Sequence, residues 1–401
     1  MELSRRRFVG ALAAAPVAYA LASADEAAAK LGHGRHGYRL RPLAKTKVFD
    51  PSDGTGFGAV TSIGNFTDTS LVKRNGRWTL LGGAQHRATG RLGMYSASLP
   101  QGAPLSATGW KIDTVPGDPT TAAPLVPDPP GEAWDGLGGR HCLSYVRGWD
   151  PALNGGLGGW QERLYYVGAN PSFGGPYSIG YVVWDGAQWT IPADVPQPVF
   201  AASESLGGST GRFSGVYEPN VIYHDGKWRM WFVCGPPDAQ NHMQHGYVES
   251  VDGRTNWTNK KVYWPAAADV FDNAVIRSPK RGWGHGHGGG HRHGHLGHRH
   301  GRGFEAVFSR FALSFQPRDD WGIWWHRADE PYDSPARWSE PVQLVQANDG
   351  SAWHSLGVWK PTIGYSDTQP GRAFVFFDGG FPFGRGAEYT TGCVECEVVP
   401  L

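Results

Sequence analysis

A pattern of fourteen residues occurs twice in this chain of 401 residues, first at 68–81 and again, without a gap, at 218–231. Each copy opens on an acidic residue, continues through apolar residues to an Asn-Gly or Asp-Gly pair, and resumes with a basic residue, a tryptophan and a second apolar run. Such pairs between apolar runs are typical of two-residue hairpin turns, because both turn residues adopt positive φ. The pattern therefore predicts a β-hairpin that recurs along the chain, as in repeat architectures.

Similar starts, more divergent or with longer insertions, occur near residues 140, 272 and 360. Several hairpins are followed by a further strand-like run and a tryptophan, so each unit is expected to contain three or four strands. Five such units around an axis predict an all-β fold, a single five-bladed β-propeller. A pair of β-sandwiches is the alternative, but a sandwich does not explain a recurring start with one charged residue at its opening.

The composition excludes several other classes of protein. Glycine (58 residues) and proline (30) are the two poorest helix formers, so the chain cannot consist mostly of long helices. Tryptophan (18), tyrosine (15) and phenylalanine (18) supply the apolar area that a disordered chain lacks. The 37 basic residues are balanced by 36 acidic ones, whereas a nucleic-acid-binding protein usually has a basic excess. We therefore expect no nucleic-acid partner.

The first 24 residues have the order of a secretory signal. Arg5, Arg6 and Arg7 precede a short alanine-rich run that is a poor candidate for a membrane span, and small residues follow at 22–24. An arginine pair before an apolar pair is typical of a twin-arginine export signal, with an ordinary secretory signal as the alternative. We expect a secreted, extracellular protein that is not membrane-bound once the signal at 1–24 is removed. A linker is predicted at 25–45 and the propeller at 46–401.

Cysteine and histidine usage adds two further expectations. Export permits disulfides, and Cys393 and Cys396 are predicted either to pair or to remain free thiols, in preference to a zinc site, because no second Cys-x-x-Cys motif exists. Cys142 and Cys234 are predicted to be buried small hydrophobic residues. Residues 285–300 contain seven of the 16 histidines, which predicts a solvated, His-rich inserted loop at about 281–303; metal binding by this tract is an open alternative.

One of the repeated units carries a family resemblance. The string Glu-Pro-Asn-Val-Ile-Tyr-His-Asp-Gly-Lys-Trp-Arg-Met-Trp-Phe at 218–232 is followed by Ser-Val-Asp-Gly-Arg-Thr-Asn-Trp at 250–257. It resembles the blade pattern of five-bladed propeller glycoside hydrolases, the family 43 arabinanases and xylosidases and their relatives acting on fructans, arabinofuranosides and mannosides. In that superfamily the first strand of each blade lines a central funnel, and its opening residue points into the site. The resemblance places Asp68, Arg140 (or His141), Glu218, Asp272 and Lys360 in these opener positions.

Glycoside hydrolysis requires two carboxyl groups, one protonated and one ionised. The resemblance implies that Asp68 is the base or nucleophile and Glu218 the general acid. A third acid on blade two usually tunes the general acid in those enzymes, but the sequence has Arg140 there. Asp135, or Asp272 on blade four, is the candidate replacement. The alternative for each acid is a structural role as a cap at the start of a strand.

Other residues are expected to bind substrate. Arg140 and Lys360 are predicted to bind a sugar carboxylate or hydroxyl, or to pair with the acids. Sugar faces stack on aromatic rings, so Trp134 and Trp353 are candidate platforms, with core packing as the alternative for each. The resemblance requires no cofactor, and a structural calcium ion near the propeller axis, held with the help of His354, is an open alternative.

The sequence therefore predicts a secreted glycoside hydrolase, or a transglycosylating relative, that acts as a monomer on an oligo- or polysaccharide. A carbohydrate-binding propeller without catalysis is the first alternative, favoured by the absent blade-two acid. A lyase or phosphoester hydrolase that uses Arg140, Lys360 and a metal is the second. The fold alone does not decide among these functions.

Overall fold

The structure is a computed structural model that describes residues 37–136, 139–169, 175–208, 210, 213–238, 242–279, 303–314, 317–383 and 386–401, without the side chains of 382–387. The predicted signal at 1–24 and nearly all of the His-rich loop at 281–303 lie outside the described residues. The chain divides into a small unit, residues 1–38 with 400–401, and a large unit, Arg39–Val399. No helix among the described residues is long and apolar enough to cross a membrane.

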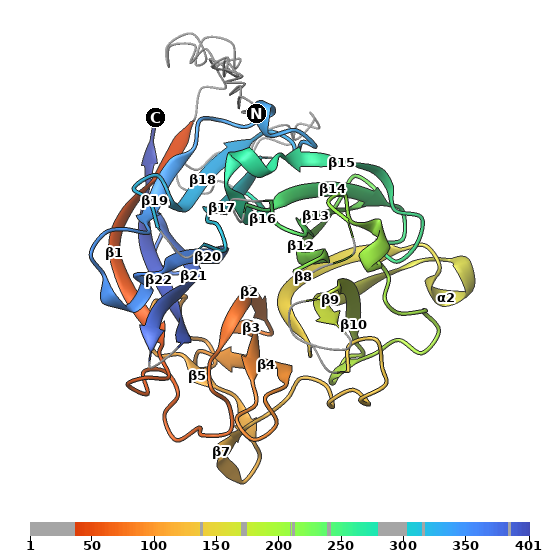
Figure 1. Ribbon diagram of the computed structural model, residues 1–401, viewed down its shortest axis with the longest axis horizontal. Helices are drawn as coiled ribbons and strands as arrows, with labels where there is room; N and C mark the ends of the chain where they lie inside the picture. Colours follow the sequence, from red (N-terminus) through yellow and green to blue (C-terminus); the bar gives the residue numbers. More distant parts are fainter. Residues whose placement is uncertain are drawn as a thin grey trace, which may run out of the picture. The chain divides into compact units, whose positions relative to one another are not determined.

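The large unit is the predicted five-bladed propeller, with antiparallel blades set around an axis (Figure 1). Each blade begins at one of the five starts read from the sequence. The inner strands of the blades are β2 (Thr67–Arg74), β8 (His141–Asp150), β12 (Gly215–His224), β16 (Val270–Arg277) and β20 (Gly357–Tyr365). The strands that follow them are β3 (Arg77–Gln85), β4 (Leu92–Ser98), β5 (Lys111–Ile112), β9 (Gly159–Ala169), β10 (Tyr177–Trp184), β11 (Trp189–Thr190), β13 (Lys227–Gly235), β14 (Gln244–Ser250), β15 (Thr258–Trp264), β17 (Phe304–Arg310), β18 (Gly322–Ala328), β19 (Val342–Gln346), β21 (Arg372–Phe383) and β22 (Gly386–Pro400).

Shorter elements connect the blades. They are the hairpin of β6 (Thr114–Val115) and β7 (Asp118–Ala122), the four-residue helix α2 (Leu153–Gly156), and single 3₁₀ turns at Ala202–Glu204, Ala266–Ala268, Pro335–Arg337 and Ala352–His354. Blades two and three join into one eight-stranded sheet, because β10 pairs with β12 in parallel at Tyr177 and Gly215. The two predicted turns have the expected geometry, with φ of 47° at Asn75 and 50° at Asp225.

The last blade contains the first strand of the chain. Strand β1 (Tyr38–Phe49) is the outermost strand of the sheet β1-β22-β21-β20. The predicted linker at 25–45 therefore extends too far, because its last residues lie in this strand. The reason is that an outermost strand is half exposed, and β1 presents polar side chains such as Arg39 and Arg41 outward. Its partner β22 is at the other end of the sequence.

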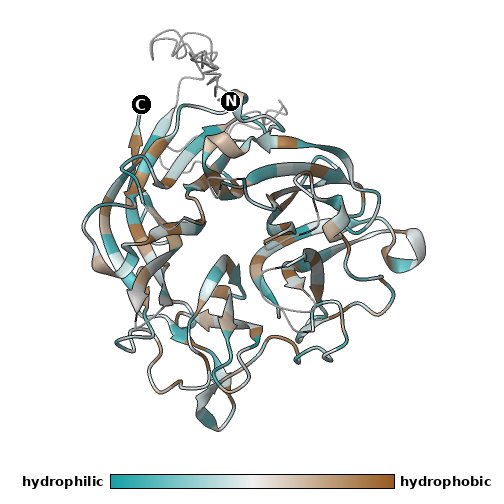
Figure 2. Cartoon of the chain, viewed as in Figure 1, coloured by the Kyte–Doolittle hydropathy of each residue, from teal (hydrophilic) through white to brown (hydrophobic). Residues whose placement is uncertain are grey.

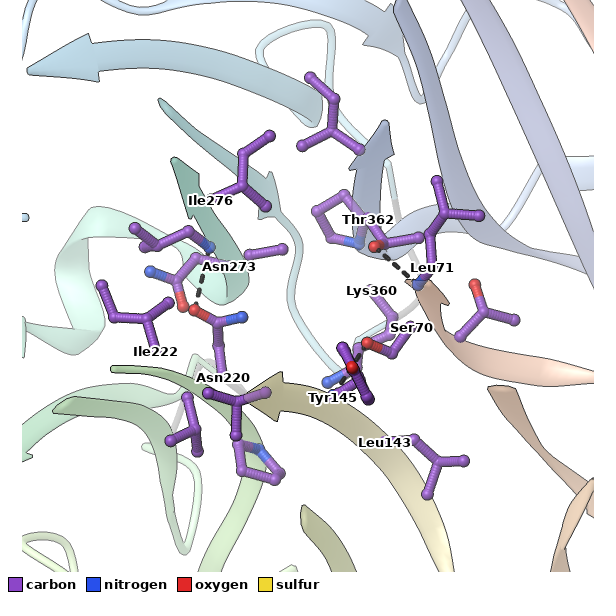
Figure 3. A pocket seen from close by; sticks show the side chains of 18 of the residues that line it. Ser70, Leu71, Leu143, Tyr145, Asn220, Ile222, Asn273, Ile276, Lys360 and Thr362 are labelled. Carbon is purple, nitrogen blue, oxygen red and sulfur yellow. Dashed lines mark hydrogen bonds between the residues drawn. The ribbon is translucent and has the colours of Figure 1, made fainter. Parts of the chain in front are cut away.

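A ring of hydrogen bonds links the inner strands around the axis. In four blades a polar side chain two residues after the opener accepts a hydrogen bond from the backbone N–H of the next inner strand. The acceptor–donor pairs are Ser70 with Tyr145 (3.0 Å), Ser144 with Val221 (2.9 Å), Asn220 with Val275 (2.9 Å) and Thr362 with Leu71 (3.2 Å), three of them seen in Figure 3. The equivalent residue of blade four is Ala274, which has no side-chain acceptor. We call this ring the inner belt.

Tryptophan and tyrosine fill the space within and between blades. Trp228, Trp231 and Trp325 are fully buried, as expected of repeat core residues. Hydrophobic and hydrophilic residues are interspersed along the strands of every blade (Figure 2), as expected of strands whose two faces differ.

All four cysteines are buried free thiols. Cys393 and Cys396 both lie on β22, and residues three apart on a strand point to opposite faces. The free-thiol alternative of the sequence analysis is therefore the one found.

Candidate functional site

The openers of the five blades meet at one end of the axis. The register of each inner strand slips close to its opener, so that the opener lies in or beside a β-bulge. Four of these residues have positive φ, a strained conformation for a residue with a side chain that is typical of functional sites: Asp68 (55°), Cys142 (53°), Glu218 (51°) and Lys360 (46°). We call Asp68, Cys142, Glu218, Asp272, Lys360 and the neighbouring Asp378 the axial cluster.

Lys360 and Glu218 form the central ion pair of this cluster. Lys360 Nζ lies 2.9 Å from Glu218 Oε2, and both side chains are buried. Burial by itself would lower the pKa of Lys360, but the charges of Glu218, Cys142 and Asp272 and the hydrogen bond to Glu218 raise it above its ordinary value. Lys360 is therefore an ammonium group whose charge is paired with the carboxyl group of Glu218.

Asp272 holds the backbone at Lys360. Its Oδ2 accepts a hydrogen bond from the Lys360 N–H (2.6 Å), and its Oδ1 accepts one from Ser309 Oγ (2.6 Å). Burial and repulsion by Glu218 raise the pKa of Asp272 to about 7, against an ordinary value of 3.8. Asp272 thus positions Lys360 and contributes a carboxyl group that holds its proton more tightly than usual.

Asp68 is the most open acid of the cluster. It is partly exposed, whereas Glu218, Asp272 and Asp378 are buried. Its backbone N–H donates to Asp378 Oδ2 (2.6 Å). Desolvation and repulsion by Glu218 raise the pKa of Asp68 to about 7, and desolvation and Asp68 raise that of Asp378 well above its ordinary value. The open end of the cluster therefore has a carboxyl group with a proton to donate near neutral pH.

Cys142, and not Arg140, occupies the opener position of blade two. Strand β8 begins at His141, and Ser144 of the inner belt follows Cys142 by the same two residues that separate Ser70 from Asp68. Cys142 Sγ donates a hydrogen bond to Glu218 Oε1 at 3.1 Å, and the buried thiol has a pKa well above 9.0 because of desolvation and the nearby acids. A thiol thus stands where the resemblance expects an acid.

Arg140 and Asp135 form a separate, buried pair beside blade two. Arg140 Nε donates to Asp135 Oδ2 (2.7 Å) and Nη1 donates to the carbonyl of Pro127 (2.9 Å). Tyr166 Oη also donates to Asp135 (2.9 Å). Both charged groups are thereby engaged, so Arg140 does not contact the axial cluster and Asp135 does not replace the missing third acid.

The predicted sugar platforms and His354 have aromatic or polar partners outside the axial cluster. Trp134 stacks on Tyr166 of blade two (centroids 5.7 Å apart), and Trp353 stacks on Phe377 of blade five (5.8 Å). His354 Nε2 lies 2.6 Å from Lys45 Nζ, and burial and Lys45 lower the pKa of His354 to about 4. Asp349 pairs with Lys45 and lies 3.6 Å from His354 Nε2, so the charges beside His354 are balanced and the calcium ion stays a prediction.

An arc of aromatic rings follows the openers, and the sequence analysis did not identify it. The residues directly before four of the openers are His141, Tyr217, Phe271 and Trp359. Rings in contact at 5.0–6.2 Å between centroids continue the arc, in the order His141, Tyr177, Tyr217, Phe271, Phe311, Trp359 and Tyr389. An aromatic residue before four of the five start motifs was the signal that could have revealed it.

A cavity of about 240 Å³ lies between the inner strands (Figure 3), lined mainly by residues that follow the openers in the sequence. Its polar lining includes Asn220, Asn273 and Tyr145, and Lys360 lies on its wall. Asp68, Glu218 and Asp272 are not among the residues that line it. The acids therefore belong to the end of the axis at which the inner strands begin.

Comparisons with known proteins identify the fold. No protein-family model matches the chain, and no relative among curated proteins is found by sequence. A solved structure of BT0996 in an RGII complex aligns with a TM-score of 0.53 and 11% identity over 89% of this chain and 92% of the other. Another, named only as a glycoside hydrolase, aligns with a TM-score of 0.51 and 10% identity, again over 89% and 92%. The chain is similar to these proteins in fold.

Proposed function

We propose that this protein is a glycoside hydrolase in which Asp68 and Glu218 form the catalytic carboxyl pair. The observation that carries the proposal is the different surroundings of the two groups within one cluster. The ammonium group of Lys360 contacts Glu218, whereas the pKa of Asp68 is raised to about 7. Cleavage of a glycosidic bond requires two carboxyl groups with different roles, and the different surroundings of Asp68 and Glu218 suit them to such roles.

The surroundings of the two acids reverse the roles that the resemblance implies. Glu218 pairs with the only ammonium group that contacts a cluster acid among the described residues, so its carboxyl group is held in place by Lys360. Asp68 is partly exposed and holds its proton near pH 7, so it is suited to donate that proton. We therefore assign Asp68 as the general acid and Glu218 as the carboxylate on the other side of the bond.

The reaction then follows from these two states. Asp68 transfers its proton to the glycosidic oxygen as the bond from that oxygen to the anomeric carbon breaks. The carboxylate of Glu218 stabilises the positive charge that develops at the sugar ring. Water supplies the hydroxyl group that replaces the leaving group, and its proton restores the starting protonation of the pair. Asp272 contributes indirectly, by fixing the backbone of Lys360.

A carbohydrate substrate and an extracellular location complete the proposal. The two solved structures of the same fold are named for a glycoside hydrolase and for an RGII complex, which supports a sugar substrate. The signal-like residues 1–24 support export by a twin-arginine-type route. Sequencing the N-terminus of protein recovered from the culture medium of an expressing cell tests the location. A start near residue 25 is expected, and retention of the intact chain inside the cell would contradict it.

The second candidate function is carbohydrate binding without catalysis. One observation favours it: the blade-two opener is the thiol of Cys142, so the third acid of the resembling enzymes is missing. A protein of this kind would bind glycans and release no reducing sugar from them.

A substrate screen separates the two functions. The mature chain is incubated with arabinan, xylan, fructan and aryl furanosides, and the release of reducing sugar or phenol is measured. Hydrolysis of at least one substrate is expected, with none by the Asp68→Asn/Glu218→Gln double variant and full activity in Asp320→Asn, whose carboxyl group is 54% exposed. Binding to a glycan array without release of sugar would instead support the binding protein.

A further inference from the structure

We propose that Asp68, His141 and Cys142 form a binding site for one Zn²⁺ ion, at the edge of the axial cluster. A carboxylate oxygen of Asp68, a ring nitrogen of His141 and Cys142 Sγ all lie within 4.8 Å of one another. The proposed hydrolysis requires no metal, so this site goes beyond it.

The fold of blade two brings two of these ligands together. His141 and Cys142 are consecutive, and consecutive side chains of a regular strand point to opposite faces. The bulge at the start of β8, with a φ of 53° at Cys142, breaks this alternation. His141 and Cys142 are 8% and 2% exposed, so the two donors converge on Asp68 in the interior.

The three donor atoms indicate which metal ion the site should bind. Zinc prefers thiolate, imidazole and carboxylate ligands in a tetrahedron, and sites that do chemistry commonly have three protein ligands and a fourth position open to water. Calcium and magnesium prefer six or more oxygen ligands. One sulfur, one nitrogen and one oxygen donor therefore fit Zn²⁺, or its probe Co²⁺, better than the calcium ion suggested by the family resemblance.

The charges around the proposed zinc site favour a cation in addition to the ammonium group of Lys360. Asp68, Glu218, Asp272 and Asp378 place four carboxyl groups in the axial cluster. Within the part of the chain that the structure describes, Lys360 is the one lysine or arginine side chain that pairs with any of them. Binding of the metal releases the thiol proton of Cys142 and the carboxyl proton of Asp68 to the buffer, without oxidation or reduction. Zn²⁺ and Lys360 together then balance the charges of Asp68, Glu218 and the Cys142 thiolate.

Zinc binding and sugar cleavage would compete for Asp68. A carboxylate bound to a metal cannot donate a proton, so Zn²⁺ should inhibit hydrolysis and a chelator should restore it. This consequence rests on the proposed function, whereas the metal site itself does not.

Cobalt provides a direct test, because a thiolate bound to Co²⁺ gives a charge-transfer absorption band in the near ultraviolet. The reduced full chain is titrated with Co²⁺, and the band is expected to reach its maximum at one Co²⁺ per chain. Cys142→Ser should abolish the band. Cys234→Ser, which removes a thiol equally buried on β13, should retain it. The histidines at 285–300 supply no thiolate, so cobalt bound there gives no such band.

A second variant keeps the test decisive if Cys142→Ser fails to fold. Asp68→Asn retains the thiol and removes one ligand, so the band should still form. The affinity for Co²⁺ should fall by at least about tenfold, which is the smaller end of the loss expected when a metal site is disturbed. Absence of the band in the native chain overturns the proposal, as does an undiminished band in Cys142→Ser. Sugar release without a cobalt band would refute the metal site alone. A cobalt band without sugar release would refute the hydrolase alone.

Discussion

Lys360 Nζ lies 2.9 Å from Glu218 Oε2, with the two side chains 4% and 6% exposed. The contact joins the inner strands of blades three and five, and it distinguishes Glu218 from the other acids of the axial cluster. One carboxyl group is paired with a cation, while Asp68 and Asp272 have raised pKa values. The ion pair is thus the feature from which the proposed roles of Asp68 and Glu218 follow.

Removing the ammonium group of Lys360 should destabilise the protein. Lys360→Met leaves the buried carboxylate of Glu218 without its partner, and breaking a buried pair in this way costs about 3–5 kcal/mol. The free energy of unfolding is measured by urea denaturation at pH 7. The double variant Lys360→Met/Glu218→Gln should recover part of the loss, because no unpaired charge remains. A Lys360→Met variant as stable as the native protein would show that the pair is not formed.

The free energy of unfolding should decrease as the pH rises from about 6.5 to 8.5. Asp68 and Asp272 have folded-state pKa values of about 7 against an ordinary 3.8, so the folded state binds more protons than the unfolded state up to pH 7. Deprotonation then costs stability, by about 1–2 kcal/mol over this range. The buried histidines have lowered pKa values and act in the opposite direction, but only below their ordinary value of 6.5; they are His141, His245, His326 and His354.

Urea denaturation at several pH values within that range measures this dependence. Asp272→Asn should reduce the slope, since it removes one of the cluster acids with a raised pKa. A native profile that is flat, or that rises with pH, would contradict the protonation states assigned to the cluster.

Each hydrogen bond of the inner belt should make its own contribution to the free energy of unfolding. Ser144→Ala removes the acceptor of the Val221 N–H in a buried position, and an unpaired buried donor costs about 1–3 kcal/mol. Ser355→Ala, at an exposed serine, is the matched control and should change stability little. Equal melting temperatures for the two variants would mean that the belt carries no stability.

The fold could be predicted because its signals are local. The turns at Asn75 and Asp225 each lie within one hairpin, and the five starts repeat one short motif. Strand β1 was missed because its partner β22 is more than 300 residues away, and no local pattern marks that pairing. Asp378 was not identified because it lies on the second strand of its blade and not at a start motif; the register of β20 and β21 places it opposite Trp359.

The candidate site was predictable only in part. Asp68, Glu218, Asp272 and Lys360 were identified by their position in the repeat, and they do come together. Cys142 was missed because charge was expected at the opener, and Arg140 stood two residues away. An alignment on the belt residues would have avoided the error, since Ser144 matches Ser70. The pairing of Lys360 with Glu218 depends on side-chain geometry across the axis, which a repeat motif does not specify.

The most direct test of the account compares leaving groups. Values of kcat/KM are measured for two aryl glycosides of the sugar found in the screen, one with a poor and one with an activated leaving group. Asp68→Asn should lose about 10²–10⁴-fold on the poor leaving group, which needs a proton, and less than about tenfold on the activated one. Glu218→Gln should lose activity on both substrates. If Glu218→Gln alone shows the leaving-group dependence, Glu218 is the general acid and the assignment made from the Lys360 contact is wrong.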